Sequence, residues 1–184
     1  MSVMVAMLRG INLAKHRRIR MEDLRALYGS LDLSDVRTLV QSGNVVFRTA
    51  ERDPERLTAR LEKAFVREFG FHSDHILRTI PDMRGVIAAN PFATRKDLEP
   101  SKLLVTFLGG DPGEAARRKV RAIQVEPEEL HIIGREMYVY FHNGMGRSKL
   151  PFAALDRALG ITGTSRNWNS VTKLLALAEG VDAL

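Results

Sequence analysis

Four short polar segments of the 184-residue chain combine the residue types that bind anions. Arginine forks onto carboxylate and phosphate groups, lysine adds a point charge, and glycine lets backbone N–H groups approach a ligand closely. Amide and hydroxyl side chains complete such sites. The candidate ligand-binding side chains of the four segments are Arg9, Asn12, Gln41, Ser42, Asn44, Arg147, Lys149, Arg166 and Asn167.

The first two segments also have structural interpretations. Arg9-Gly10-Ile11-Asn12 follows the first apolar run, where Gly10 would bring the backbone to a ligand and Arg9 would bind its charge. The alternative, favoured for this segment taken alone, is a tight exit from a strand with Arg9 paired to a local acid. Gln41-Ser42-Gly43-Asn44 offers two amides and a hydroxyl, but its residue types favour a hairpin turn.

The other two segments each precede a predicted helix. Residues 144–149 hold two glycines, a hydroxyl and two cations. They suit an anion cradle and, equally, a loop in which Ser148 caps the next helix. Residues 163–169 are predicted to lead directly into the last helix, which places Arg166 at a helix N-terminus, where anions are favoured. Trp168 is predicted to be a core residue rather than a surface for stacking a base.

Several kinds of chemistry are excluded or unsupported. The absence of cysteine excludes disulfides, cysteine nucleophiles, zinc ribbons and iron–sulfur sites. The chain has neither a nucleophile elbow nor a P-loop, and its basic segments lack paired carboxylates. His72-Ser73-Asp74-His75 has metal-ligating residue types but no evident distant ligand. The sequence therefore predicts no metal and no cofactor, assigns no catalytic residue, and leaves open whether the protein is an enzyme.

Basic residues concentrate in two parts of the chain. The 28 lysines and arginines outnumber the 22 acidic residues, which gives a net charge of +6 and a pI of about 10.0. Residues 9–20, Lys15 among them, hold five cations and no acid, and residues 144–173 hold five cations and one acid. If the two stretches meet in space they form a cationic face. The alternative is two solvated loops that keep the protein soluble.

The N-terminal apolar run gives an expectation about location. Residues 2–10 are too short an apolar stretch to cross a bilayer, and they lack the basic start and the cleavage site of a secretory signal. We expect a cytoplasmic protein that does not bind membranes.

Apolar periodicity and turn residues predict a similar order of elements in both halves of the chain. Predicted strands cover residues 3–8, 36–40, 45–48, 75–80, 102–108, 129–133 and 137–141. Predicted helices cover residues 21–31, a stretch from 54 onward, 81–89, 113–123, 150–159 and 168–178. Asp53-Pro54 and Asp111-Pro112 each provide an N-cap followed by proline at the first helical position.

This order predicts an α+β protein made of two similar ferredoxin-like lobes. Each lobe is a split βαβ unit with an antiparallel or mixed sheet and helices on one face. Residues 93–100 lie between two prolines and form the predicted linker between an N-terminal lobe, 1–92, and a C-terminal lobe, 101–184. The second lobe lacks an obvious final strand and is expected to end in a helix.

Two groups of motifs resemble the uncharacterised bacterial family called domain of unknown function 1697 (DUF1697). The first group runs from Leu8-Arg9-Gly10-Ile11-Asn12 to Gln41-Ser42-Gly43-Asn44-Val45-Val46-Phe47. The second joins Gly146-Arg147-Ser148-Lys149-Leu150 to Thr164-Ser165-Arg166-Asn167-Trp168-Asn169. Members carry glycines where this chain has Ala14-Lys15, and threonine where it has Ser170. The resemblance covers essentially the whole chain. It implies two α+β lobes of similar topology and no established activity.

Three classes of function fit these observations. The first is a non-catalytic nucleic-acid binder, with RNA as the preferred partner, in a basic cleft between the lobes. The second is an enzyme or sensor for a small phosphorylated or carboxylated metabolite. The third is a protein interaction module whose motif side chains only hold the structure together. We expect binding rather than catalysis, and no pattern in the sequence specifies the ligand or the oligomeric state.

Overall fold

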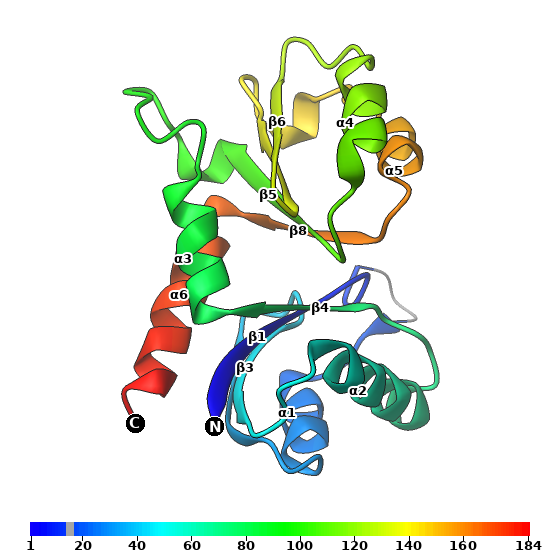
Figure 1. Ribbon diagram of the computed structural model, residues 1–184, viewed down its shortest axis with the longest axis vertical. Helices are drawn as coiled ribbons and strands as arrows, with labels where there is room; N and C mark the ends of the chain where they lie inside the picture. Colours follow the sequence, from blue (N-terminus) through cyan, green and yellow to red (C-terminus); the bar gives the residue numbers. More distant parts are fainter. Residues whose placement is uncertain (14–16) are drawn as a thin grey trace. The chain divides into compact units, whose positions relative to one another are not determined.

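The computed structural model describes residues 1–13 and 17–184, which form two compact units (Figure 1). Unit 1 consists of Met1–Gly85 with Thr172–Leu184, and unit 2 of Val86–Val171. Ala14 and Lys15, which mark a departure from the family pattern, lie outside the described residues. No helix in the described part of the chain is long and apolar enough to cross a membrane.

Unit 1 contains a four-stranded sheet in the order β2-β3-β1-β4. The central strand β1 pairs antiparallel with β3 and β4, so that Val5 lies opposite both Val46 and Arg78. This pairing is the split βαβ arrangement of a ferredoxin-like fold. The elements are β1 (Ser2–Leu8), α1 (Met21–Gly29), β2 (Ser34–Leu39), β3 (Asn44–Thr49), α2 (Pro54–Phe69) and β4 (His75–Thr79).

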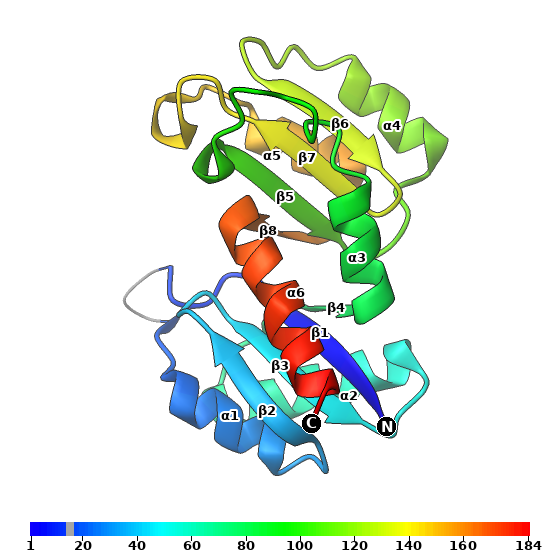
Figure 2. The same ribbon diagram turned by 90° about the vertical axis from the view of Figure 1, so that its left-hand side faces the viewer.

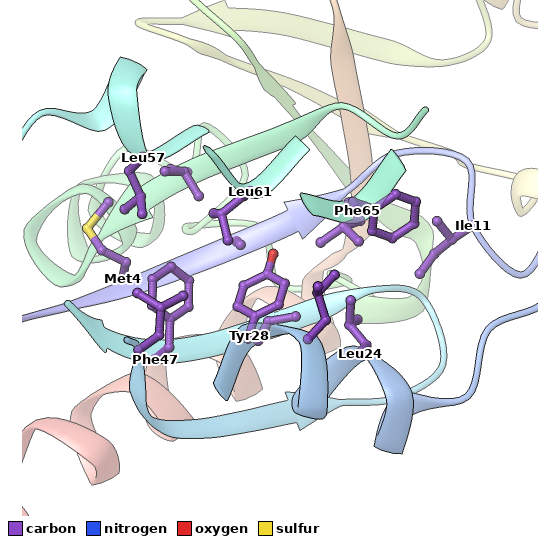
Figure 3. Close-up of a cluster of buried hydrophobic side chains, with 14 of the residues drawn as sticks. Met4, Ile11, Leu24, Tyr28, Phe47, Leu57, Leu61 and Phe65 are labelled. Atoms are coloured by element: carbon purple, nitrogen blue, oxygen red, sulfur yellow. The ribbon is translucent and has the colours of Figure 1, made fainter. Parts of the chain in front are cut away.

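The first face of this sheet is covered by α1 and α2. Side chains alternate along a strand, which sends Met4, Ala6 and Leu8 of β1 to the same face. They pack against buried residues that recur at helical spacing, so the sheet and both helices share one core (Figure 3). The helical contribution is Leu24, Leu27 and Tyr28 from α1 and Leu57, Leu61 and Phe65 from α2.

The α2 helix begins as its sequence predicts. The Asp53 side chain accepts hydrogen bonds from the backbone N–H groups of Glu55 and Arg56, and Pro54 occupies the first helical position. Gly70 ends the helix in the left-handed conformation, at a φ of 76°. These signals fix where α2 stops and where the segment leading to β4 begins.

Unit 2 repeats the architecture with the sheet order β6-β7-β5-β8. Val105 of the central strand lies opposite both Tyr138 and Arg166, the same relation that Val5 has in unit 1. All strand pairs in both sheets are antiparallel, and the predicted α+β fold with two ferredoxin-like lobes is confirmed. The elements are β5 (Leu103–Leu108), α4 (Gly113–Arg121), β6 (Glu129–Ile133), β7 (Glu136–Tyr140), α5 (Phe152–Leu159) and β8 (Gly163–Asn167).

Two local predictions for the second half are wrong. This half does have a fourth strand, β8, where the sequence predicted a loop leading into a helix. Its residues, Gly-Thr-Ser-Arg-Asn, lack apolar alternation, and pairing with β5 overrides that weak local preference. In addition, α4 begins at Gly113 as its predicted range does, but Asp111 is not its N-cap residue. Pro112 occupies the N-cap position, and Asp111 Oδ1 accepts a hydrogen bond from the Gly113 backbone N–H at 2.8 Å.

Two further helices, α3 (Ile80–Ala88) and α6 (Trp168–Asp182), follow the fourth strands and each continues into the other unit. Within unit 1, α6 lies on the second face of the sheet, where Arg48 of β3 donates a hydrogen bond to the Val181 carbonyl (Figure 2). Within unit 2, Tyr138 of β7 donates one to the Val86 carbonyl near the end of α3, at 2.8 Å. Within unit 2 the last residues of α3 therefore contact β7, and within unit 1 the α6 helix covers the second face of the sheet.

The course of α6 affects how the chain divides into units. Because α6 returns to unit 1, the units share out the chain differently from the predicted lobes 1–92 and 101–184. That division, with its linker at 93–100, stays a prediction about the sequence. The sequence predicted helices on one face of each sheet. In unit 1 this is true of α1 and α2, but α6 covers the other face as well.

Candidate functional site

The first two polar segments meet within unit 1, just after β1. Asn12 has a left-handed backbone, at a φ of 55°, and its Nδ2 donates a hydrogen bond to the Gln41 carbonyl at 2.6 Å. Its Oδ1 accepts one from the Ile19 backbone N–H at 2.9 Å, and its backbone N–H donates to the Arg17 carbonyl at 2.9 Å. One asparagine therefore closes the loop that follows β1 and joins it to the β2–β3 turn.

The β2–β3 turn fits closely against this loop because residue 43 is glycine. Gly43 has a φ of 73°, and a Cβ at this position would lie 2.5 Å from Ile11 Cδ1 and 2.9 Å from Leu8 Cβ. The buried Asn44 donates hydrogen bonds to the Leu39 carbonyl at 3.1 Å and to Ser42 Oγ at 2.8 Å. Segment 41–44 therefore forms the tight turn that its residue types favour.

A pocket of about 660 Å³ lies beside this junction, within the usual size range of small-molecule sites. Among the described residues that line it, three are arginines and one is acidic, so this part of the wall is predominantly cationic. The lining comes from the end of the loop, the start of α1 and the hairpin turn: Asn12, Arg18, Ile19, Arg20, Met21, Glu22, Arg25 and Gln41.

The three arginines of the pocket are held differently. Arg20 binds Asp23 through hydrogen bonds of 2.9 and 2.8 Å, and this bonding holds the pKa of the Asp23 carboxyl below its ordinary value. Arg25 is half-buried and donates a hydrogen bond to Thr38 Oγ1 at 2.6 Å. Arg18 is exposed. Because Thr38 is a neutral partner, Arg25 brings a full positive charge to the pocket wall.

The start of α1 adds backbone donors to these charges. The helix begins at Met21, and Arg20 stands at the N-cap position with an extended backbone and no capping side-chain bond. The first N–H groups of a helix lack intrahelical acceptors and carry partial positive charge. Glu22 and Asp23 in the first turn offset part of that charge. Guanidinium groups and backbone N–H donors together suit a phosphate or a carboxylate.

Arg9 lies near this region but does not line the pocket. Its Nη1 is 3.7 Å from Asp74 Oδ2, and its side chain is 46% exposed. Its backbone N–H donates to the Asp74 carbonyl at 3.0 Å, and its carbonyl accepts a hydrogen bond from Ser73 Oγ at 2.8 Å. This is the alternative geometry anticipated from the sequence, a strand exit with Arg9 beside a local acid.

The predicted residues of unit 2 have dissimilar environments. Arg147 and Lys149 are exposed on the segment between β7 and α5. Arg166 is buried in β8, with 6% of its surface exposed, and donates hydrogen bonds to Thr164 Oγ1 at 2.9 Å and to the Ser165 carbonyl at 2.8 Å. Burial lowers the pKa of Arg166 to about 10. The expectation that Arg166 sits at a helix N-terminus is therefore wrong, because its backbone belongs to a strand.

Asn167 and Trp168 mark the transition from β8 to α6. Asn167 Oδ1 accepts a hydrogen bond from the Ser170 backbone N–H at 2.9 Å, as an N-cap does. Trp168 is half-buried, not the fully buried core residue that its helical spacing suggested. The convergence of these unit 2 segments with those of unit 1 stays a prediction.

Sequence reasoning does not single out Arg18, Arg20 and Arg25 as site residues. Arg18 and Arg20 contribute only to the charge of the basic stretch, and Arg25 stands beyond it. A usable signal exists, because Met21 and Arg25 are four residues apart and so share one face of the predicted helix. The pocket lies where this helix face meets the 41–44 turn, so the sequence indicates it once the two segments are taken to be neighbours.

Two ferredoxin-like sheets with the same strand order define a duplicated α+β protein. Residues 1–138 match the family described as protein of unknown function DUF1697, and the chain belongs to this family. The resemblance based on the motifs is thereby confirmed. The second group of motifs, within residues 146–169, lies beyond the matched part of the chain.

A solved structure with a similar fold is that of the conserved bacterial protein SP0830 from Streptococcus pneumoniae. The TM-score is 0.74 and the sequence identity 20%, with 97% of this chain and 99% of that chain covered. At this identity the similarity shows a shared fold. None of the curated proteins matches the chain. Function is therefore argued from the geometry of the chain's own residues.

Proposed function

We propose that the protein binds a phosphate-bearing ligand in the pocket at the start of α1. The observation that supports this most directly is the gathering of Arg18, Arg20 and Arg25 around one cavity of about 660 Å³. Guanidinium groups pair with phosphate oxygens in a fork, and the N–H groups of the first turn of α1 complement them. RNA and small phosphorylated metabolites share this chemistry, and the uneven basic charge of the chain favours RNA.

Other lining residues suit the remainder of a nucleotide-like ligand. Ile19 and Met21 contribute apolar surface on which a base or an aliphatic group can lie. Glu22 and Gln41 contribute acceptors that suit sugar hydroxyl groups. An arginine cluster with both kinds of neighbour favours a ligand larger than inorganic phosphate.

Other polar residues, outside the group of pocket arginines, fit the alternative that the protein is an interaction module. Asn44 and Arg166 are buried and hydrogen-bonded to local partners, as that class of function requires. Asn12 likewise joins the loop to the hairpin turn. We assign these side chains a structural role and place ligand binding on the pocket arginines.

The experiment compares the double variant Arg18→Gln/Arg25→Gln with the wild type and with Arg67→Gln. Arg67 is an exposed arginine of α2 outside the pocket lining, so its variant is a control for loss of charge. Fluorescence anisotropy measures the affinity for a short labelled single-stranded RNA at low and physiological salt. Thermal shift with nucleoside monophosphates measures small-ligand binding, because a ligand of the folded state raises its stability.

We expect the double variant to bind at least about tenfold more weakly, which corresponds to roughly 1.4 kcal/mol, and the control to bind like the wild type. If RNA is the ligand, affinity falls steeply with salt. If a small metabolite is the ligand, the melting temperature rises saturably with little dependence on salt. Absence of binding to both probes at low salt, or equal weakening by Arg67→Gln, would overturn the proposal.

A further inference from the structure

Three metal-ligating side chains come together beside α2 and the segment that follows it. Glu62 belongs to this helix, and His72 and Asp74 lie on the segment that joins it to β4. One ligand atom of each residue lies within 4.8 Å of those of the other two. The sequence shows the pair at 72 and 74 but not its third member, since Glu62 is brought to it by the helix.

The segment after α2 presents its two ligands on the same side. Ser73 is buried and donates a hydrogen bond from Oγ to the Arg9 carbonyl at 2.8 Å. His72 is exposed and Asp74 half-buried, so the residues on either side of Ser73 point outward. His72 Nε2 lies 3.1 Å from Asp74 Oδ1.

Glu62 is oriented toward this pair by the backbone. Its Oε1 accepts a hydrogen bond from the His75 backbone N–H at 3.0 Å, which fixes the carboxylate at the start of β4. A carboxylate has two oxygens and accepts several bonds, so this contact leaves capacity for a metal ion. One donor, Glu62, is therefore held by α2, and the other two lie on the short segment between α2 and β4.

The two carboxylates of the cluster, Glu62 and Asp74, would be stabilised by a bound cation. Two carboxylates close together repel each other, and Arg9 Nη1 stands 3.7 Å from Asp74 Oδ2, beyond hydrogen-bond distance. A divalent ion would neutralise both carboxylates at once and would take the place of a proton on His72 Nε2. Arg9 then acts as a competitor of the ion for Asp74.

We infer that Glu62, His72 and Asp74 form a binding site for a divalent transition-metal ion, with Zn²⁺ as the expected occupant. One imidazole with two carboxylates suits Zn²⁺, whereas Mg²⁺ and Ca²⁺ prefer oxygen ligands alone. Tetrahedral bonds of about 2.1 Å separate ligand atoms by roughly 3.4 Å, close to the present spacing of His72 and Asp74. Three protein ligands leave the fourth position to water.

Unit 2 contains a comparable histidine–carboxylate pair, but no second carboxylate among the described residues completes a set of three metal ligands there. His142 Nε2 lies 2.7 Å from Glu129 Oε1, and Arg95 Nη1 lies 2.6 Å from the same oxygen. The third group is here the Arg95 guanidinium, which also binds Asp97 Oδ1 at 2.9 Å, so a cation already occupies the place that a metal ion would take. His142 therefore provides the control for a histidine–carboxylate pair without metal affinity.

The test is a calorimetric titration of Zn²⁺ into the full, tag-free chain, stripped with EDTA and dialysed, at pH 7.5. The variants are His72→Asn, Asp74→Asn, Arg9→Gln and His142→Asn, each checked for folding by circular dichroism. His72 is exposed, so its substitution leaves the core intact. A titration of Co²⁺ followed by its visible spectrum reports ligand geometry independently of the heat signal.

We expect the wild type to bind one Zn²⁺ with a Kd of about 10 µM or below. His72→Asn and Asp74→Asn should bind at least about tenfold more weakly, because each removes a ligand. Arg9→Gln should bind a few-fold more tightly, and His142→Asn like the wild type. The inference is overturned if the wild type does not bind one ion, if His72→Asn binds as well as the wild type, or if Arg9→Gln weakens binding.

Discussion

The connections that follow the two central strands show how equivalent positions acquire different roles. Helices α1 and α4 occupy the same place after β1 and β5, and each carries an arginine at its fifth position, Arg25 and Arg117. Arg117 donates hydrogen bonds to the Ile132 and Gly134 carbonyls at 3.2 and 2.8 Å and to Asp111 Oδ1 at 2.9 Å. Its side chain is only 16% exposed, so it fastens α4 to the β6–β7 hairpin.

In unit 1 the arginine at the fifth position of the helix, Arg25, lines the pocket. Arg25 contacts the neutral Thr38 of β2 and lines the pocket beside the longer, basic connection 9–20. The corresponding connection of unit 2 is the short segment 109–112, which places Asp111 against its arginine. The repeated fold therefore places an arginine at the same position in both units. The connection before the helix differs, and this difference determines whether an acidic side chain neutralises the arginine or its charge remains available to a ligand.

The largest expected effect tests the hairpin turns of the two units. Gly43→Ala should lower the free energy of unfolding by about 3 kcal/mol, because a left-handed backbone and three close carbon contacts all oppose a Cβ. Gly134→Ala should cost only about 1 kcal/mol, since it meets only Glu136 Oε2 at 3.7 Å. Urea unfolding followed by circular dichroism measures both. Equal losses would show that the unit 1 turn is no more tightly packed than its counterpart.

The second prediction concerns pH, to which the two fourth strands should respond differently. His75 begins β4 and is buried, and burial lowers its pKa to about 4, whereas Gly163 begins β8. The unfolded chain, with an ordinary histidine pKa near 6.5, binds the proton more readily, so stability is retained above pH 6.5 and lost as the pH falls toward 4. Between pH 7.5 and 5 the free energy of unfolding should fall by about 2 kcal/mol.

Urea unfolding of the metal-free wild type and His75→Gln at both pH values measures this loss. The variant should lose much less stability on acidification than the wild type, whatever its stability at pH 7.5. A fall of the same size in the variant would assign the pH dependence to other groups.

The smallest effect separates the two arginines directly. Arg117→Met should lower the free energy of unfolding by about 1.5 kcal/mol, because it removes charged hydrogen bonds to two backbone carbonyls. Arg25→Met should cost less than about 1 kcal/mol, since a single bond to a hydroxyl is lost. The same variants, titrated with the RNA and nucleotide probes, should show the opposite ranking, with affinity lost only in Arg25→Met. If the two variants lose equal stability and equal affinity, Arg117 and Arg25 do not differ in role as proposed.

The fold is largely predictable from the sequence because its signals are local. Apolar periodicity and caps such as Asp53-Pro54 place most elements within a few residues of their observed bounds. The strand β8 escapes prediction because its pairing with β5, not its residue types, makes it a strand. The course of α6 escapes for a similar reason, since helical periodicity does not say which sheet a helix will cover.

The candidate sites are less predictable because they depend on contacts between distant segments. The sequence indicates that Asn12 and the 41–44 turn matter, but their bonds to each other arise only when β1 pairs with β3. Arg25 and Glu62 stand on ordinary helix faces, and nothing in their immediate neighbours distinguishes them. Only the packing of α1 beside the hairpin and of α2 beside β4 gives them their roles.

The return of α6 to unit 1 has a consequence for how the chain can be divided. The second face of the unit 1 sheet includes the buried Val3, Val5 and Val46, and the helix that covers it belongs to the last residues of the chain. A fragment that ends near residue 90 would leave this apolar face bare, and the remaining fragment would carry a helix with no surface to cover. A separately made fragment 1–90 should therefore bind the fragment that carries α6, because that contact buries the exposed apolar face.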